Sequence, residues 1–109
     1  MDKRRYQRIS VQGLSADISD GKGFFSGTVS DISQLGISLN HISRHLDRDA
    51  HILSVIVEGK GAHFKLLVTQ KWESTNGEFK IIGTQIETSP WDWTDFVSQL
   101  EPEEDDVRS

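Results

Sequence analysis

Three arginines near the start of the chain have side chains suited to binding an anionic ligand. They are Arg4, Arg5 and Arg8, and the outer two are spaced as R-x-x-x-R. A guanidinium fork forms paired hydrogen bonds with phosphate oxygens, or with O6 and N7 of a guanine base. A basic run taken alone is usually a solvated surface segment. These arginines therefore indicate a site only if a second group of residues supports them.

A second segment combines an acid, a hydroxyl group and a glycine at fixed spacing. Asp31, Ser33 and Gly36 fit the pattern (D/N)-x-S-x-x-G. Alone, this pattern is common in turns, where Asp and Ser side chains bond to nearby backbone groups. The triplet Asp17–Ser19 repeats its beginning, but Lys22 stands where the glycine would be. We interpret that copy as ordinary strand and turn.

Together, the two segments resemble the motifs of the PilZ family. In that family R-x-x-x-R near the N-terminus is followed by (D/N)-x-S-x-x-G, and this chain keeps every motif position. The resemblance extends from Arg4 to about Leu100. It implies a six-stranded antiparallel β-barrel with a C-terminal helix. It also implies a bacterial receptor for cyclic di-GMP, which changes its surface on ligand binding and so regulates a protein partner.

The same resemblance implies a role for each motif residue. The arginines clamp the phosphates and guanines, and the acid accepts hydrogen bonds from guanine N1–H and N2–H₂. The serine binds phosphate or base, and the glycine permits a turn or a close approach that a Cβ would block. Motility, exopolysaccharide synthesis, pilus function and biofilm formation are the regulated processes that the family offers. The expected ligand-binding residues are Arg4, Arg5, Arg8, Asp31, Ser33 and Gly36.

Composition excludes several other classes of protein. The 109 residues suffice for one domain, and the absence of cysteine excludes disulfides and cysteine zinc sites. The chain shows no signal peptide and no apolar run of about 18 residues, so we expect a cytoplasmic protein without membrane insertion. Its net charge of -5 disfavours general binding of DNA or RNA.

Alternating apolar residues predict a mainly β fold of short antiparallel strands. The alternation is clear in residues 14–18 and 53–57. Turn signals at Asp20–Gly23, Glu58–Gly61 and Asn76–Gly77 separate strands of this kind. The Asn-Gly pair predicts a type I′ hairpin turn, because both residues tolerate positive φ.

The middle of the chain is predicted to contain one bulge, one loop and one long strand. Gly27 is expected to mark the β-bulge. The polar segment 41–50 is expected to form the loop, with Leu46 as its apolar anchor. The long strand is expected to turn one face inward, formed by Phe64, Leu66, Val68 and Trp72.

Near the end of the chain the apolar period changes to that of a helix. Ser89 can cap this helix and Pro90 fits its first position, which predicts a helix over about residues 90–100. Its apolar stripe consists of Trp93, Phe96, Val97 and Leu100.

The charges divide the chain into three parts. Residues 1–8 form a basic arm, and residues 102–109 form an acidic tail. Both segments lack the apolar residues that would offset the entropy cost of ordering them, so we expect both to be flexible. Residues 9–101 are predicted to be the barrel domain with its helix. A small anionic ligand at the basic end fits this distribution.

Two alternative functions remain open. One is a PilZ-like adaptor that binds protein and no nucleotide. The other is a small barrel that binds single-stranded nucleic acid, which would need basic residues and exposed aromatics on one sheet face. We expect only Trp91 of the three tryptophans to be exposed, which disfavours the second alternative. The sequence contains no catalytic constellation, no metal-site pattern and no cofactor fingerprint, so we expect no enzyme.

Overall fold

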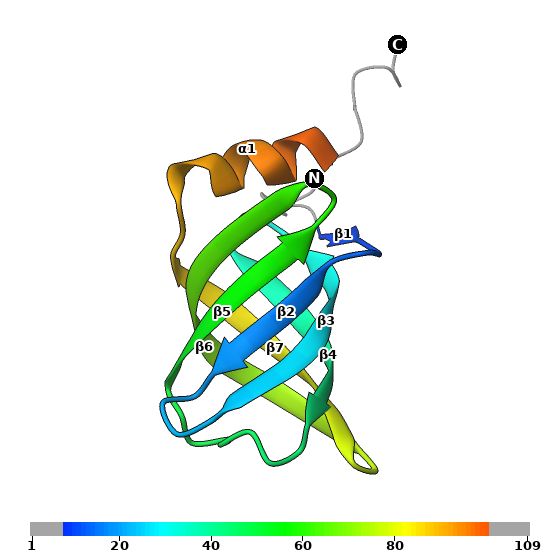
Figure 1. The fold of residues 1–109 in the computed structure, drawn as a ribbon, viewed down its shortest axis with the longest axis vertical. Helices are drawn as coiled ribbons and strands as arrows, with labels where there is room; N and C mark the ends of the chain where they lie inside the picture. The colour runs from blue at the N-terminus through cyan, green and yellow to red at the C-terminus, as the bar shows by residue number, and fades with distance from the viewer. Residues whose placement is uncertain (1–7, 101–109) are drawn as a thin grey trace, which may run out of the picture.

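The chain forms a closed β-barrel with one helix across its end, in a computed structural model that describes residues 8–100 (Figure 1). Six antiparallel strands form the wall in the order β2-β5-β6-β7-β4-β3, and β3 closes the ring by pairing with β2. The predicted fold class, a small six-stranded antiparallel barrel with a C-terminal helix, is confirmed. The elements are β1 (Ile9–Ser10), β2 (Ser15–Ser19), β3 (Phe24–Ile32), β4 (Gly36–Ser43), β5 (Ile52–Gly59), β6 (Ala62–Asn76), β7 (Phe79–Thr88) and α1 (Trp91–Leu100).

Strand β3 also fixes the start of the described chain. One edge of β3 pairs with β4, and the other pairs with β2 and then, at its last two residues, with the short β1. In β1, Ile9 pairs with Ile32 and Ser10 pairs with Asp31. Because Arg8 directly precedes β1, this pairing holds Arg8 beside the end of β3.

The interior of the barrel is filled by alternate residues of its strands. The inward positions predicted in residues 14–18 and 53–57 are all buried, with exposures of 2 % or less. Alternation places one face of each strand in the core and the other in solvent. The remaining strands complete the core with Val29, Ile32, Ile37, Leu39, Ile42, Phe64, Leu66, Val68 and Ile82.

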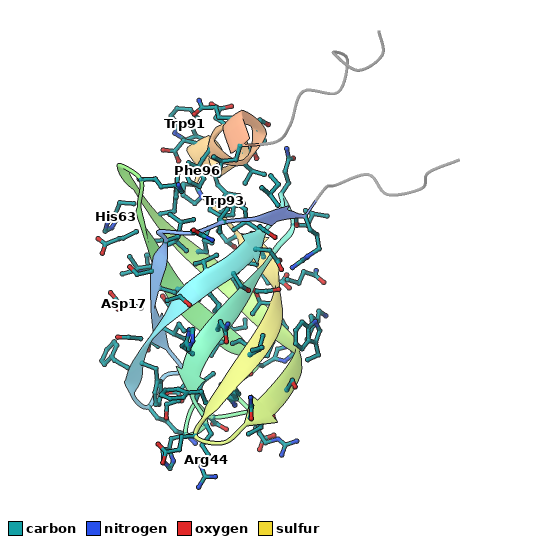
Figure 2. All side chains as sticks on the ribbon, turned by 90° about the vertical axis from the view of Figure 1, so that its right-hand side faces the viewer. Asp17, Arg44, His63, Trp91, Trp93 and Phe96 are labelled. Atoms are coloured by element: carbon teal, nitrogen blue, oxygen red, sulfur yellow. The ribbon has the colours of Figure 1, made fainter. Side chains whose placement is uncertain are left out.

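Helix α1 lies across one end of the barrel (Figure 1). Its predicted apolar stripe faces the core, with Trp93 and Val97 fully buried. Trp93 meets Phe64 edge-on, with ring centroids 5.3 Å apart. Figure 2 shows Trp93 and Phe96 on the barrel side of the helix and Trp91 farther out. No helix within residues 8–100 is long and apolar enough to span a membrane.

Both tight hairpins form where turn signals were predicted, but one has a different turn. Lys60 and Gly61 connect β5 to β6, and both have positive φ, as a type I′ turn requires. Between β6 and β7, Asn76 pairs with Phe79, so the connecting residues follow Asn76. Of these, only Gly77 has positive φ. The predicted type I′ turn at Asn76–Gly77 is therefore wrong, because Asn76 belongs to the strand.

Strand β6 contains an irregularity that the alternation did not reveal. Its register with β7 shifts between Gln70 and Trp72, so Lys71 is an extra residue on this strand. One extra residue reverses which side chains face inward. Phe64 is buried as predicted, but the expectation that Trp72 faces the core is wrong, since its side chain is 53 % exposed.

The predicted bulge at Gly27 is also wrong. The register shift between β3 and β4 lies between Val29 and Asp31. A Cβ at Gly27 would stand 2.2 Å from Cδ1 of Ile42. The same Cβ would stand 2.7 Å from the backbone carbonyl oxygen of Asn40, so the glycine is needed for the close approach of β3 to β4. The extra residue of the bulge comes later in β3.

The opposite end of the barrel is closed by a loop tied to a buried lysine. Strand β4 continues to Ser43, so the loop predicted over residues 41–50 begins later than expected. Leu46 is buried, as predicted for its anchor. The Lys80 Nζ, in a residue only 2 % exposed, donates to the Leu46 carbonyl at 3.1 Å and to Glu73 Oε1 at 2.8 Å. This pairing satisfies a charge that would be costly to bury alone.

Candidate functional site

One row of cross-strand neighbours carries the candidate site. The register pairs Ser10 with Asp31, Asp31 with Ser38, Ser38 with Gly83, and Gly83 with Trp72. The five residues lie on the neighbouring strands β1, β3, β4, β7 and β6. Directly paired residues point to the same face of a sheet. That face is the outer one, because the residues on either side of Ser38 and Gly83 are buried in the barrel.

Arg8 reaches into this row from the start of β1. Its Nη2 donates to the Asp31 carboxylate, forming an ion pair, and to Ser38 Oγ at 2.9 Å. The Arg8 side chain is 47 % exposed and that of Asp31 is 30 % exposed. Two of the predicted ligand-binding residues, one from each sequence motif, are thus brought into direct contact.

Gly36 lies beside Arg8 and allows β4 to approach β7. A Cβ on Gly36 would stand 2.5 Å from the carbonyl oxygen of Thr84 and 3.8 Å from Nη1 of Arg8. The backbone oxygen cannot move away without breaking the strand pairing. The glycine is therefore required by a close approach, which is one of the two roles expected for it.

Ser33 uses its side chain inside the turn between β3 and β4. Its Oγ accepts hydrogen bonds from the backbone N–H groups of Gly36 at 3.1 Å and Leu35 at 3.3 Å. It also lies 3.3 Å from the Gly36 carbonyl oxygen, to which the hydroxyl donates. The residue is 4 % exposed. In this arrangement Ser33 shapes the turn that positions Asp31 and Gly36.

The cross-strand row formed by Ser10, Asp31, Ser38, Gly83 and Trp72 is called the outer row below. A pocket of about 430 Å³ lies over it. Arg8, Lys71 and Asp31 all line this hollow. Two cations and one carboxylate favour a ligand that combines negative charge with hydrogen-bond donors. The lining residues are Arg8, Ser30, Asp31, Ser38, Lys71, Trp72, Ile81, Gly83 and Thr84.

Seven of the nine pocket residues, all except Arg8 and Asp31, were not among the expected site residues. Ser38 and Gly83 each stand between two inward residues, so strand alternation alone would have placed them on the outer face. Lys71 and Trp72 could not have been found in this way, because the bulge at Lys71 reverses the alternation. Exposed Trp72 also removes one argument made against binding of single-stranded nucleic acid.

Two larger hollows lack the charge that a phosphate ligand needs. One, of about 880 Å³, runs from Ser10 to Ser15 and across β3 and β4, and its lining contains no lysine, arginine or carboxylate. The other, of about 650 Å³, lies between α1 and the β5–β6 hairpin. Lys60 and His63 line it together with the carboxylates of Asp92 and Asp95. The pocket of about 430 Å³ over the outer row is therefore the better candidate for an anionic ligand.

The remaining predicted site residues, Arg4 and Arg5, lie outside the described residues, and so do most of the predicted basic arm and all of the acidic tail 102–109. Within residues 8–100, no three metal-binding side chains of His, Asp or Glu gather in one place. His63 instead pairs with Glu58 at 2.7 Å, and His41 lies 3.2 Å from Thr28 Oγ1.

Comparison with known proteins supports the fold and leaves the family open. No family model and no curated protein matches the sequence. A solved structure, the inhibitor of motility MotI/DgrA from Bacillus subtilis, is similar over 91 % of this chain with a TM-score of 0.73. The chain spans 49 % of that protein and is 14 % identical to it in sequence. At this identity the likeness shows that the two proteins share the barrel-and-helix fold.

Proposed function

We propose that this protein is a cyclic di-GMP receptor that regulates a protein partner and binds its ligand over the outer row. One observation carries the proposal. Arg8 and Asp31, from two motifs far apart in the sequence, contact each other on the wall of one pocket. A guanidinium fork beside a carboxylate complements guanine, which has acceptors on one edge and donors on another. The proposed function is binding, without catalysis and without a cofactor.

Ligand binding would exchange the Arg8–Asp31 ion pair for contacts with guanine. Arg8 would donate to O6 and N7, and Asp31 would accept from N1–H and N2–H₂. An exposed ion pair of this kind contributes about 0–1 kcal/mol to stability. One bidentate arginine–guanine contact is worth about 1–3 kcal/mol. The exchange is therefore favourable on balance.

The PilZ resemblance adds two more guanidinium groups to this proposal. Arg4 and Arg5 lie four and three residues before Arg8 in the sequence and would supply charge for the two phosphates. The likeness to an inhibitor of motility supports a regulatory role. Motility, exopolysaccharide, pilus and biofilm functions are the processes that this role would serve.

A second function is a protein-binding adaptor that binds no nucleotide. It is favoured because side chains of the candidate site already have hydrogen-bond partners within the protein. Arg8 already bonds to both Asp31 and Ser38. Ser33 already bonds to its own turn. A structural role for these contacts needs no ligand, so binding must be measured.

Calorimetric titration with cyclic di-GMP decides between the two functions, with cyclic di-AMP and GTP as controls. Adenine presents a donor where guanine presents O6, so the adenine analogue should bind at least tenfold more weakly. Arg8→Ala should raise Kd by about one to two decades. Arg8→Lys keeps the charge but loses the planar fork, so it should also bind more weakly than wild type.

Arg44→Ala is the matched control, because Arg44 lies at the end of the barrel opposite α1 (Figure 2). Its affinity should equal that of the wild-type protein. Folded wild-type protein that releases no heat with cyclic di-GMP at any tested concentration, and shows no shifted amide signals, would leave the adaptor as the function.

A further inference from the structure

The hollow of about 650 Å³ between α1 and the β5–β6 hairpin, called the α1 groove below, is not used by the proposed ligand site. One side of it is formed by Asp92, Asp95, Phe96 and Gln99 of the helix. Their spacing of i, i+3, i+4 and i+7 places them on one helix face. Trp93 is fully buried and points into the barrel instead. The helix therefore packs on the barrel with one face and lines the α1 groove with another.

Aromatic side chains surround the α1 groove. Phe64 and Phe96 line its inner part, where their ring centroids lie 4.9 Å apart. Trp91, the first residue of α1, lines it as well but is 83 % exposed. Figure 2 shows Trp91 and Phe96 on the same side of the molecule as His63 of the hairpin. A single exposed aromatic residue needs no explanation, but Trp91 stands at the entrance of a groove that already has aromatic walls.

The charges of the α1 groove are unbalanced. Asp92 and Asp95 contribute two carboxylates, and Lys60 contributes one ammonium group. His63 lies 2.7 Å from a carboxylate oxygen of Glu58, which matches any charge on its ring. Within residues 8–100, neither aspartate forms an ion pair. Asp92 stabilises the first turn through the helix dipole, but Asp95 lies beyond that turn and has no such role.

A carboxylate beside an exposed aromatic ring fits a flat cationic side chain. Arginine has this chemistry, because its guanidinium group forms paired hydrogen bonds with a carboxylate and stacks on an aromatic face. Tryptophan and arginine are also enriched among the residues that dominate the binding energy of protein interfaces. Phe96 and Leu100 are only partly buried at the α1 groove and would contact an apolar neighbour of this arginine.

Helix α1 also contacts the turn of the second motif. Gln34 Nε2 donates to Ser98 Oγ of the helix at 3.4 Å. Gln34 directly follows Ser33, whose turn positions Asp31. The helix thus borders the segment that carries the proposed ligand contacts and also forms the α1 groove. This proximity suits a surface through which a ligand regulates a partner.

We propose that the α1 groove is the docking site for the protein partner, and that it binds an arginine of that partner together with an adjacent apolar side chain. Trp91 would cover the face of the guanidinium group, and Asp95 would accept its hydrogen bonds. The inference rests on the part of the proposed function that assigns a protein partner. Docking itself needs no nucleotide.

Selection of random peptides tests the chemistry of the occupant before any natural partner is known. A library displayed on phage is selected on the wild-type protein and depleted on the double variant Trp91→Ser/Asp95→Lys. Both residues are exposed, so this variant should fold. Enriched peptides should contain an arginine next to a large apolar residue. The best peptide, once synthesised, serves as the probe for calorimetry.

Single substitutions then locate the bound peptide. Trp91→Ser and Asp95→Lys should each raise its Kd about tenfold or more, because one removes the stacking surface and the other repels the guanidinium group. Phe24→Ser and Asp17→Lys are the matched controls, since both residues are exposed and lie outside the α1 groove. The Kd of these two variants should equal that of the wild-type protein.

The chain's own Arg4 and Arg5 have the same chemistry as the proposed partner residue. If they occupied the α1 groove, the variant Arg4→Gln/Arg5→Gln would bind the peptide more tightly than the wild-type protein. That result would replace the partner with a contact inside the chain. The proposal predicts an unchanged Kd.

Three further results would overturn the docking site: no enriched peptide, enriched peptides without a cationic residue, or equal affinity for wild type and Asp95→Lys. None of these measurements involves nucleotide. If arginine peptides bind the α1 groove and cyclic di-GMP does not bind the protein, the receptor function fails and the docking site stands. If cyclic di-GMP binds and the α1 groove selects no peptide, the docking site fails and the receptor function stands.

Discussion

Arg8 and Asp31 form an ion pair on the outer face of the barrel although 23 residues separate them in the sequence. Two local structures bring them together. The short β1 pairs with the end of β3 and so holds the residue before it in place. The Ser33 turn then directs β4 along the other edge of β3. The first motif therefore depends on the second for its position, which gives their order and spacing in the sequence a physical meaning.

Ser33→Ala should lower stability and leave ligand affinity unchanged. The substitution removes a buried hydroxyl that accepts two backbone hydrogen bonds. Leaving buried N–H groups without a partner costs about 1–3 kcal/mol. Urea unfolding should show that loss, and the Kd for cyclic di-GMP, corrected for the folded fraction, should stay within about twofold of wild type. A weakened Kd with unchanged stability would instead place the Ser33 hydroxyl on the ligand.

Asp31→Asn serves as the comparison for Ser33→Ala. It keeps the size of the side chain and loses the carboxylate that pairs with Arg8. Because that ion pair is exposed, stability should change by about 1 kcal/mol or less. Binding should weaken, since an amide cannot accept both guanine donors.

Two adjacent leucines in β6 test which side chains of this strand face the core. Leu66 is fully buried and Leu67 is 38 % exposed. Leu66→Ala should lower the free energy of unfolding by about 2–5 kcal/mol, because it leaves a cavity in a packed core. Leu67→Ala should change it by about 0.5 kcal/mol. Similar losses for both, measured by urea unfolding, would contradict the described orientation of β6.

Much of the fold could be predicted from the sequence because its strands alternate regularly where they form the core. Leu14, Ala16 and Ile18 are buried as the period of two requires. The helix stripe beginning at Trp93 is equally regular. These patterns depend only on which residues are apolar, so they can be recognised without knowing how the strands pair.

The composition of the pocket could not be predicted, because it depends on how strands pair. Trp72 is apolar and in phase with Val68, yet the bulge at Lys71 turns it outward. A bulge is fixed by the partner strand, here by the pairing of Trp72 with Gly83. The burial of Lys80 could not be predicted for a related reason. Its charge is neutralised by Glu73 on the neighbouring strand β6. This contact cannot be recognised from the sequence around either residue.

The Lys80–Glu73 pair should make stability fall in acid. The hydrogen bond from Lys80 is the largest cause that lowers the pKa of Glu73 below its ordinary value of 4.5, and burial opposes it. A depressed pKa means that the stabilisation is fully present above pH 4.5 and is lost as pH falls through the lower folded-state pKa. The difference in unfolding free energy between wild type and Glu73→Gln should therefore shrink between about pH 5 and pH 3. A difference that is constant across this range would show that Glu73 titrates normally.

Ligand binding should perturb one row of backbone amides that crosses five strands. Cyclic di-GMP placed between Arg8 and Trp72 would lie over Asp31, Ser38 and Gly83, which the register aligns. Ring currents from the bases and the loss of the Arg8–Asp31 ion pair both act at short range. In ¹H–¹⁵N spectra the largest shifts should therefore fall on these residues and on the indole N–H of Trp72.

Strands β2 and β5 provide the internal reference, because they pair with each other on a part of the wall that the row does not include. Their amides should shift little at saturation. Large shifts confined to α1 and the β5–β6 hairpin would instead place the ligand in the hollow lined by His63 and Asp95, and the outer row would lose its assignment as the binding site.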